Sequence, residues 1–113
     1  METHYKLFRV RDLADGDNEF VMALAAAFIE EVPEDAARLK KAVAEKDYYT
    51  TYQAAHKMKP TVDLFELGIL SDLIEVQDWG KFEKGDVDVT EKLNKVLMAV
   101  EKATEEIKKD FNL

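Results

Sequence analysis

Hydrophobic residues recur at spacings of three and four along most of the chain, which is the period of an α-helix. Turn residues interrupt this pattern at several points, and no segment shows the alternation that predicts a strand. We therefore expect five or six helices. Their approximate ranges are 5–14, 18–32, 33–46, 48–67, 69–81 and 87–111.

Residues that favour helix ends mark the boundaries between these segments. One aspartate of the Asp15-Gly16-Asp17 turn is expected to cap the second helix. Pro33 is expected to end that helix and open the next, because the residue before a proline avoids the α conformation. Gly68 is well suited to end the helix over 48–67. Gly80 and Gly85 are expected to flank a polar turn before the last helix.

The apolar stripes predict which side chains pack together. In the first helix, Leu7, Phe8 and Leu13 are available for packing. The stripe over 48–67 comprises Tyr48, Tyr52, Ala55, Met58, Val62 and Phe65. The stripe of the last helix comprises Val89, Leu93, Val96, Val100, Ala103 and Ile107. Short connections place successive helices antiparallel, which predicts an all-α fold: an up-down four-helix bundle with a short extra N-terminal helix, in one domain over residues 1–113.

Composition narrows the classes of function. The 113 residues include 24 Asp and Glu against 16 Lys and Arg, so the formal net charge is −8. Such a chain lacks the basic stripe that nucleic-acid binding requires, and it is poorly suited to anionic membranes. The absence of cysteine excludes disulfides, thiolate metal sites and cysteine nucleophiles. The longest apolar run, near 21–29, is too short to span a bilayer, and no export signal is present, so we expect a cytoplasmic protein.

Two histidines are present, and one of them has a setting that suits chemistry. His4 is expected to be incidental, because chain ends are usually poorly ordered. His56 falls outside the apolar stripe of its helix, on the rim or exterior of the bundle. A neutral imidazole can attack phosphorus, and Lys59, one turn on, would attract the phosphoryl oxygens. Lys57 would add to a local basic patch, and Tyr49 is the best candidate for docking a partner. The alternative is an ordinary solvated surface.

A proline in the same helix bears on whether His56 is a reactive residue or part of an ordinary solvated surface. Pro60 lies within a strong helical pattern, where proline costs about 3 kcal/mol, and it removes the amide that would bond the carbonyl of His56. Such a cost beside an exposed histidine indicates a local shape requirement. The alternative is a kink that fits Phe65 and Leu67 into the core.

The stretch from Ala55 to Thr61 resembles the phosphorylation motif of the histidine-containing phosphotransfer (HPt) family. That motif comprises a small residue, the phospho-accepting histidine, a variable residue, an apolar residue, a lysine and usually a glycine. The matching residues are His56, Met58 and Lys59, together with Leu67-Gly68 farther along. The resemblance covers nearly the whole chain. Pro60 replaces the usual glycine, which could restrict which partners dock.

The resemblance implies a place in a two-component phosphorelay. His56 would be the nucleophile and Lys59 its electrostatic support. The partners would be response-regulator receiver domains, which carry the phosphoryl group on an aspartate beside their own Mg²⁺, and a sensor or hybrid histidine kinase. Because the chain contains no ATP-binding motif, we expect a monomeric phosphoryl carrier without autokinase activity and without a cofactor or metal of its own.

Three other functions share the same helical pattern. In a non-catalytic interaction or adaptor module, His56 would be dispensable. An HPt-like decoy would bind a receiver without transferring the phosphoryl group. A metal–carboxylate bundle needs Glu-x-x-His pairs on facing helices, and the residue three places before His56 is Gln53 rather than glutamate.

Overall fold

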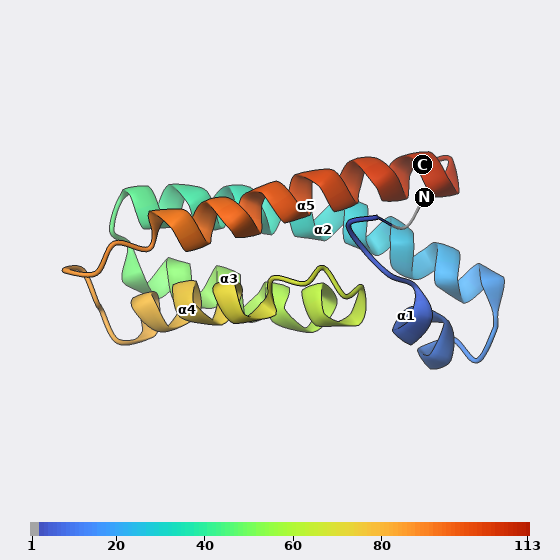
Figure 1. The fold of residues 1–113 in the computed structure, drawn as a ribbon, viewed down its shortest axis with the longest axis horizontal. Coiled ribbons are helices and arrows are strands. Elements are labelled where there is room, and N and C mark those ends of the chain that lie inside the picture. Colours follow the sequence, from blue (N-terminus) through green and yellow to red (C-terminus); the bar gives the residue numbers. More distant parts are fainter. Residues whose placement is uncertain (1–2) are drawn as a thin grey trace.

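A computed structural model describes residues 3–113 and shows five helices, with no strand in that range (Figure 1). Their bounds are α1 Phe8–Leu13, α2 Asn18–Ala44, α3 Tyr48–Leu64, α4 Leu70–Lys81 and α5 Thr90–Phe111. Helix α2 packs against α3 and α5, and α4 also packs against α3 and α5. The four long helices therefore surround one core, and α1 lies at one end of the molecule beside α2 (Figure 1). The prediction of an all-α fold is confirmed.

The core contains side chains from each of the four long helices. All six residues of the last predicted stripe are buried; five lie on α5, and Val89 directly precedes it. On α3, the predicted stripe is correct from Ala55 to Phe65, but Tyr48 and Tyr52 are only half-buried. Thr51 and Ala54 are buried in their place, because α4 packs closely on that side of α3.

Helix α2 is continuous through Pro33, so the prediction of two separate helices was wrong. A proline in a helix interior costs about 3 kcal/mol, partly because the carbonyl four residues before it loses its donor. The buried positions of α2 keep one helical period on both sides of the proline. These positions are Val21, Ala25, Phe28, Val32, Asp35, Ala36, Leu39 and Ala42. Each large apolar member contributes about 1.5–3 kcal/mol when buried, so one continuous stripe outweighs the cost of the proline.

The cap at the start of α2 is Asp17, whose carboxylate accepts hydrogen bonds from the amides of Glu19 and Phe20. At the end of α3, the prediction for Gly68 was wrong. The helix ends at Leu64, and Glu66 takes the left-handed conformation with φ of 51°. The amide of Leu67 then donates to the carbonyl of Val62 at 3.2 Å, which closes the helix end.

Gly80 is a buried residue inside α4, and it does not flank the turn as predicted. A β-carbon at this position would lie 2.7 Å from the backbone oxygen of Tyr48 and 2.9 Å from the backbone nitrogen of Tyr52. Helices α3 and α4 therefore approach so closely at Gly80 that only glycine leaves enough space. The polar turn follows Lys81 and contains Gly85.

The first helix is shorter than predicted and uses different residues for packing. Helix α1 begins at Phe8, and Phe8 and Leu13 are exposed by 80% and 59%. Leu7 is buried as predicted. The other buried residues of this segment are Tyr5, Val10 and Ala14. No helix between residues 3 and 113 combines the length and the apolar character needed to cross a membrane.

Candidate functional site

His56 lies in the middle of α3 and is exposed to solvent, as its position outside the apolar stripe predicted. The helix around it is well defined at both ends. Asp47 caps its start by accepting a hydrogen bond from the amide of Thr50, and the closed turn at Leu67 ends it. Met58 and Val62 fix the opposite side of α3 in the core. The imidazole is therefore presented to solvent by a rigid element.

One face of the imidazole is covered by an aromatic ring that precedes it by one turn. The rings of Tyr52 and His56 are stacked, with centroids 5.6 Å apart and an angle of 22° between their planes. Tyr52 is half-buried, so its own ring is anchored by the bundle. The side-chain amide of Gln53 donates to the hydroxyl of Tyr49 at 2.7 Å beside this stack. The stack restricts the imidazole while its other face remains open.

Lys59 follows His56 by three residues, which places the two Cβ atoms about 5–6 Å apart on one side of a helix. The side chain is half-buried, and it forms no ion pair with any residue from 3 to 113. Its ammonium is therefore available to an anion that approaches His56.

Lys57 does not belong to a basic patch, so this part of the sequence interpretation was wrong. Its ammonium donates to Asp35 of α2 at 3.3 Å. Asp35 is only 6% exposed, and its other cationic neighbour is Arg38 at 3.9 Å. The charge of Lys57 is thus used to satisfy a buried carboxylate between α2 and α3.

The Lys57→Ala variant is expected to lose about 1–2 kcal/mol of unfolding free energy, because it leaves the buried Asp35 carboxylate without its nearest cation. Urea unfolding at pH 7 measures this change. Arg38→Ala is the matched control and is expected to change stability less, since its contact with Asp35 is longer. Equal stability of Lys57→Ala and wild type would show that the pair has no structural role.

An ion pair that the sequence did not indicate lies at the far end of the same helix. Arg9 of α1 contacts the Asp63 carboxylate at 2.8 Å and donates to the Asp63 carbonyl at 3.1 Å. The hydrogen bond to Asp63 and the charge of Asp63 raise the pKa of the Arg9 guanidinium. Asp63 follows His56 by seven residues, so it lies on the same side of α3. The first helix therefore contacts the surface that presents His56.

Pro60 is exposed, and α3 continues through it to Leu64. Proline has no amide hydrogen, so the carbonyl of His56 lacks the usual donor four residues later. Phe65 and Leu67 are both buried beyond this point. The proline thus leaves a backbone acceptor beside the exposed imidazole.

Exposed aromatic residues extend the site toward the start of α3. Tyr49 is 69% exposed and precedes His56 by two turns, on the same side of the helix. A cleft of about 580 Å³ opens beside it, between the start of α3 and the end of α4. Its lining includes Tyr48, Tyr49 and Tyr52, together with charged residues of both signs. Since Tyr52 also stacks on His56, the cleft and the imidazole adjoin each other.

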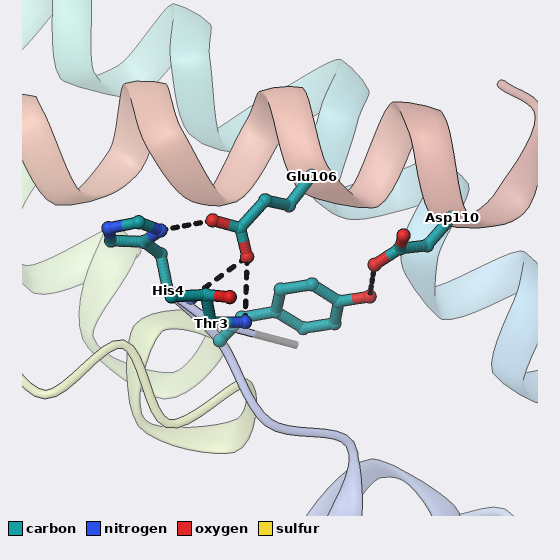
Figure 2. A network of polar contacts seen from close by, with 5 residues as sticks. Thr3, His4, Glu106 and Asp110 are labelled. Carbon is teal, nitrogen blue, oxygen red and sulfur yellow. Dashed lines mark hydrogen bonds and ion pairs between the residues drawn. The ribbon is translucent and has the colours of Figure 1, made fainter. Parts of the chain in front are cut away.

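The interpretation of His4 as incidental was wrong in structural terms. Its backbone amide and ring both bond to Glu106 of α5, at the opposite end of the sequence (Figure 2). No local pattern indicates a contact across 102 positions. Within residues 3–113, no group of three or more His, Cys, Asp or Glu side chains lies close enough to hold a metal ion.

Comparison of the chain with protein-family models, with curated proteins and with solved structures finds no match.

Proposed function

We propose that the protein is an HPt-type phosphoryl carrier in which His56 accepts a phosphoryl group from a response-regulator receiver domain and returns it to another. The observation that carries this proposal is an exposed imidazole in the middle of a packed helix, with an ammonium one turn later that forms no ion pair within the described range 3–113. An imidazole nitrogen is a good nucleophile toward phosphorus near neutral pH.

The proposed architecture is an up-down antiparallel four-helix bundle with α1 as a short extra helix. Its support is the set of helix contacts, in which α2, α3, α4 and α5 each pack on two of the others in a closed order. The connections at 45–47 and 65–69 are short, which favours antiparallel neighbours. This arrangement would present His56 on the outer side of α3.

The proposed reaction transfers the phosphoryl group from an aspartate oxygen of the receiver domain to a ring nitrogen of His56. A ring nitrogen of His56 attacks the phosphorus of an aspartyl phosphate on the receiver domain. A P–N bond forms as the P–O bond to the aspartate breaks, and the aspartate leaves as a carboxylate. The reverse reaction transfers the group to a second receiver. The receiver would supply Mg²⁺, and this chain would supply the nucleophile and the Lys59 charge near the phosphoryl oxygens.

The stacked tyrosine supports the same proposal. A freely rotating imidazole would have to find the reactive orientation in each encounter, whereas the Tyr52 ring reduces the number of orientations available to it. The cleft beside Tyr49 and Tyr52 would accept part of the docked receiver domain.

The direct test is incubation of the full chain with a phosphorylated receiver domain, followed by mass mapping of the modified residue. The proposal predicts a phosphoryl group on His56 that is lost in acid and retained in base. If a receiver domain binds at this surface but no phosphoryl group is transferred, the protein is instead a non-catalytic adaptor or a decoy.

The Lys59→Ala variant is expected to accept the phosphoryl group about tenfold more slowly, because one charge-assisted contact to the phosphoryl oxygens is lost. Its stability should change by less than about 0.5 kcal/mol, since Lys59 has no ion pair to lose among the residues that the structure describes. Single-turnover transfer from the phosphorylated receiver measures the rate. Lys40→Ala, an exposed lysine of α2, is the matched control and should transfer at the wild-type rate. A wild-type rate for Lys59→Ala would exclude the proposed role.

A further inference from the structure

The segment before α1 is attached to the end of α5 by side-chain carboxylates (Figure 2). The amides of Thr3 and His4 both donate to one oxygen of Glu106, at 2.9 and 2.8 Å. The other oxygen of Glu106 contacts the Nδ1 atom of His4. One turn later, Asp110 accepts a hydrogen bond from the hydroxyl of Tyr5 at 2.6 Å. Two carboxylates on α5 thus bind three consecutive residues of the non-helical segment before α1.

The same segment places two apolar side chains in the core. Tyr5 is 1% exposed and Leu7 is 3% exposed, and between them the amide of Lys6 donates to the carbonyl of Phe65 at 2.8 Å. Helix α1 follows directly, and Val10 and Ala14 add two more buried side chains to the same core. Its packing is mainly on α2, and its polar contact is the exposed pair of Arg9 and Asp63. Residues 3–14 lie outside the four long helices, so this segment can open locally at the cost of exposing its buried side chains.

Glu106 is the group on which this attachment depends most. Burial alone would raise the pKa of its carboxyl, but the hydrogen bonds from His4 and Thr3 outweigh this effect and lower the pKa below its ordinary value. A carboxyl whose pKa is lower in the folded state stabilises that state at pH values above its ordinary pKa. This stabilisation is lost as the pH falls through the folded-state pKa.

The charged groups around Glu106 come from two elements. The His4 imidazole faces it from the N-terminal segment, and the Tyr5 hydroxyl lies one turn away at Asp110. On α5 itself, Lys102 and Asp110 lie four residues before and after Glu106, and Lys109 lies three residues after. Uptake of a proton by Glu106 removes the negative charge that accepts the hydrogen bonds from Thr3 and His4, so it weakens the contact.

We propose that residues 3–7 form an acid-sensitive latch, which joins α1 to the end of α5 and opens when Glu106 takes up a proton while the four long helices stay folded. Opening would expose Tyr5 and Leu7, and it would free Arg9 to leave Asp63 on the His56 side of α3. The latch is a property of the fold, and it does not depend on the phosphotransfer proposal.

The test is amide hydrogen exchange of the full-length wild-type chain between pH 7 and pH 3, resolved by NMR and corrected for the intrinsic exchange rate. The amides of Thr3, His4 and Lys6 are expected to be protected at pH 7. Their protection should fall by about tenfold as the pH drops below the ordinary carboxyl pKa, with that of Val96 and Val100 in α5 unchanged.

Two variants that each remove one negative charge from α5 distinguish the loss of the Glu106 contacts from a general effect of net charge. Glu106→Gln is expected to lower the protection of the three amides about tenfold already at pH 7, and to reduce the pH response to the part that Asp110 contributes through Tyr5. Glu105→Gln, on an exposed neighbouring residue of α5, should behave like wild type. The proposal is overturned if the three amides are unprotected in wild type at pH 7. It is also overturned if they lose protection only together with Val96 and Val100, or if both variants respond alike.

Discussion

The His56→Gln variant is expected to fold like wild type and to carry no acid-labile, base-stable phosphate after incubation with a phosphorylated receiver domain. Glutamine occupies a similar volume and can form hydrogen bonds, but its amide nitrogen is not a nucleophile. The imidazole is exposed, so stability should change by less than about 0.5 kcal/mol, the usual range for a surface substitution. Circular dichroism and urea unfolding check the fold, and intact-mass measurement in base checks the phosphate.

The other histidine provides a matched control for this experiment. His4→Gln makes the same substitution 52 residues away, in the segment bound to Glu106, and it leaves the α3 surface intact. This variant should acquire the phosphate at His56 as wild type does. Full transfer to His56→Gln, or a phosphate that maps to another residue of the wild-type chain, would contradict the assignment of the nucleophile.

The Gly80→Ala variant is expected to lose about 3 kcal/mol of unfolding free energy, the upper part of the range for overpacking a core. In an unconstrained helix, alanine would stabilise by about 1 kcal/mol relative to glycine. Here the added β-carbon would lie 2.7 Å from the Tyr48 oxygen and 2.9 Å from the Tyr52 nitrogen. Both are backbone atoms of α3, so they cannot rotate aside, and the two helices must separate.

Urea unfolding at pH 7 measures this loss as a lower midpoint at a similar slope. Lys81→Ala changes the next residue of α4, which is exposed, and should shift the midpoint by far less. Because Tyr52 stacks on His56, displacement of α3 should also change the NMR shifts of the His56 ring in Gly80→Ala. A Gly80→Ala variant as stable as wild type would mean that α3 and α4 do not approach as closely as described.

The helices could be predicted from the sequence because the period of apolar residues depends only on neighbours three and four places apart. The stripe of α5 is correct at every position, and α4 matches its predicted range closely. The same local geometry placed His56 on the outer side of α3, outside the apolar stripe. Caps depend on equally short distances, which is why a cap in the turn at 15–17 could be predicted from the sequence.

Local rules failed where packing between helices determined the outcome. Pro33 carries an intrinsic preference to end a helix, but the continuous buried stripe of α2 outweighs it. Glycine is common in turns, which is why Gly80 was expected beside one. Only the position of α3 shows why a side chain is excluded there. A helix boundary is therefore predictable when the local preference and the core agree, and it is not predictable when they conflict.

The sequence by itself determined that the chain is helical, which faces of its helices are apolar, and that an imidazole and an ammonium share one side of α3. The tertiary structure decided which charges remain available there. It pairs Lys57 with Asp35, Arg9 with Asp63 and His4 with Glu106, and it leaves Lys59 without an ion pair among residues 3–113. The physical reason is that each of these pairs joins separate segments, so its formation depends on their rotation and axial position. Those quantities are set by the packing of the whole core, and no local spacing encodes them.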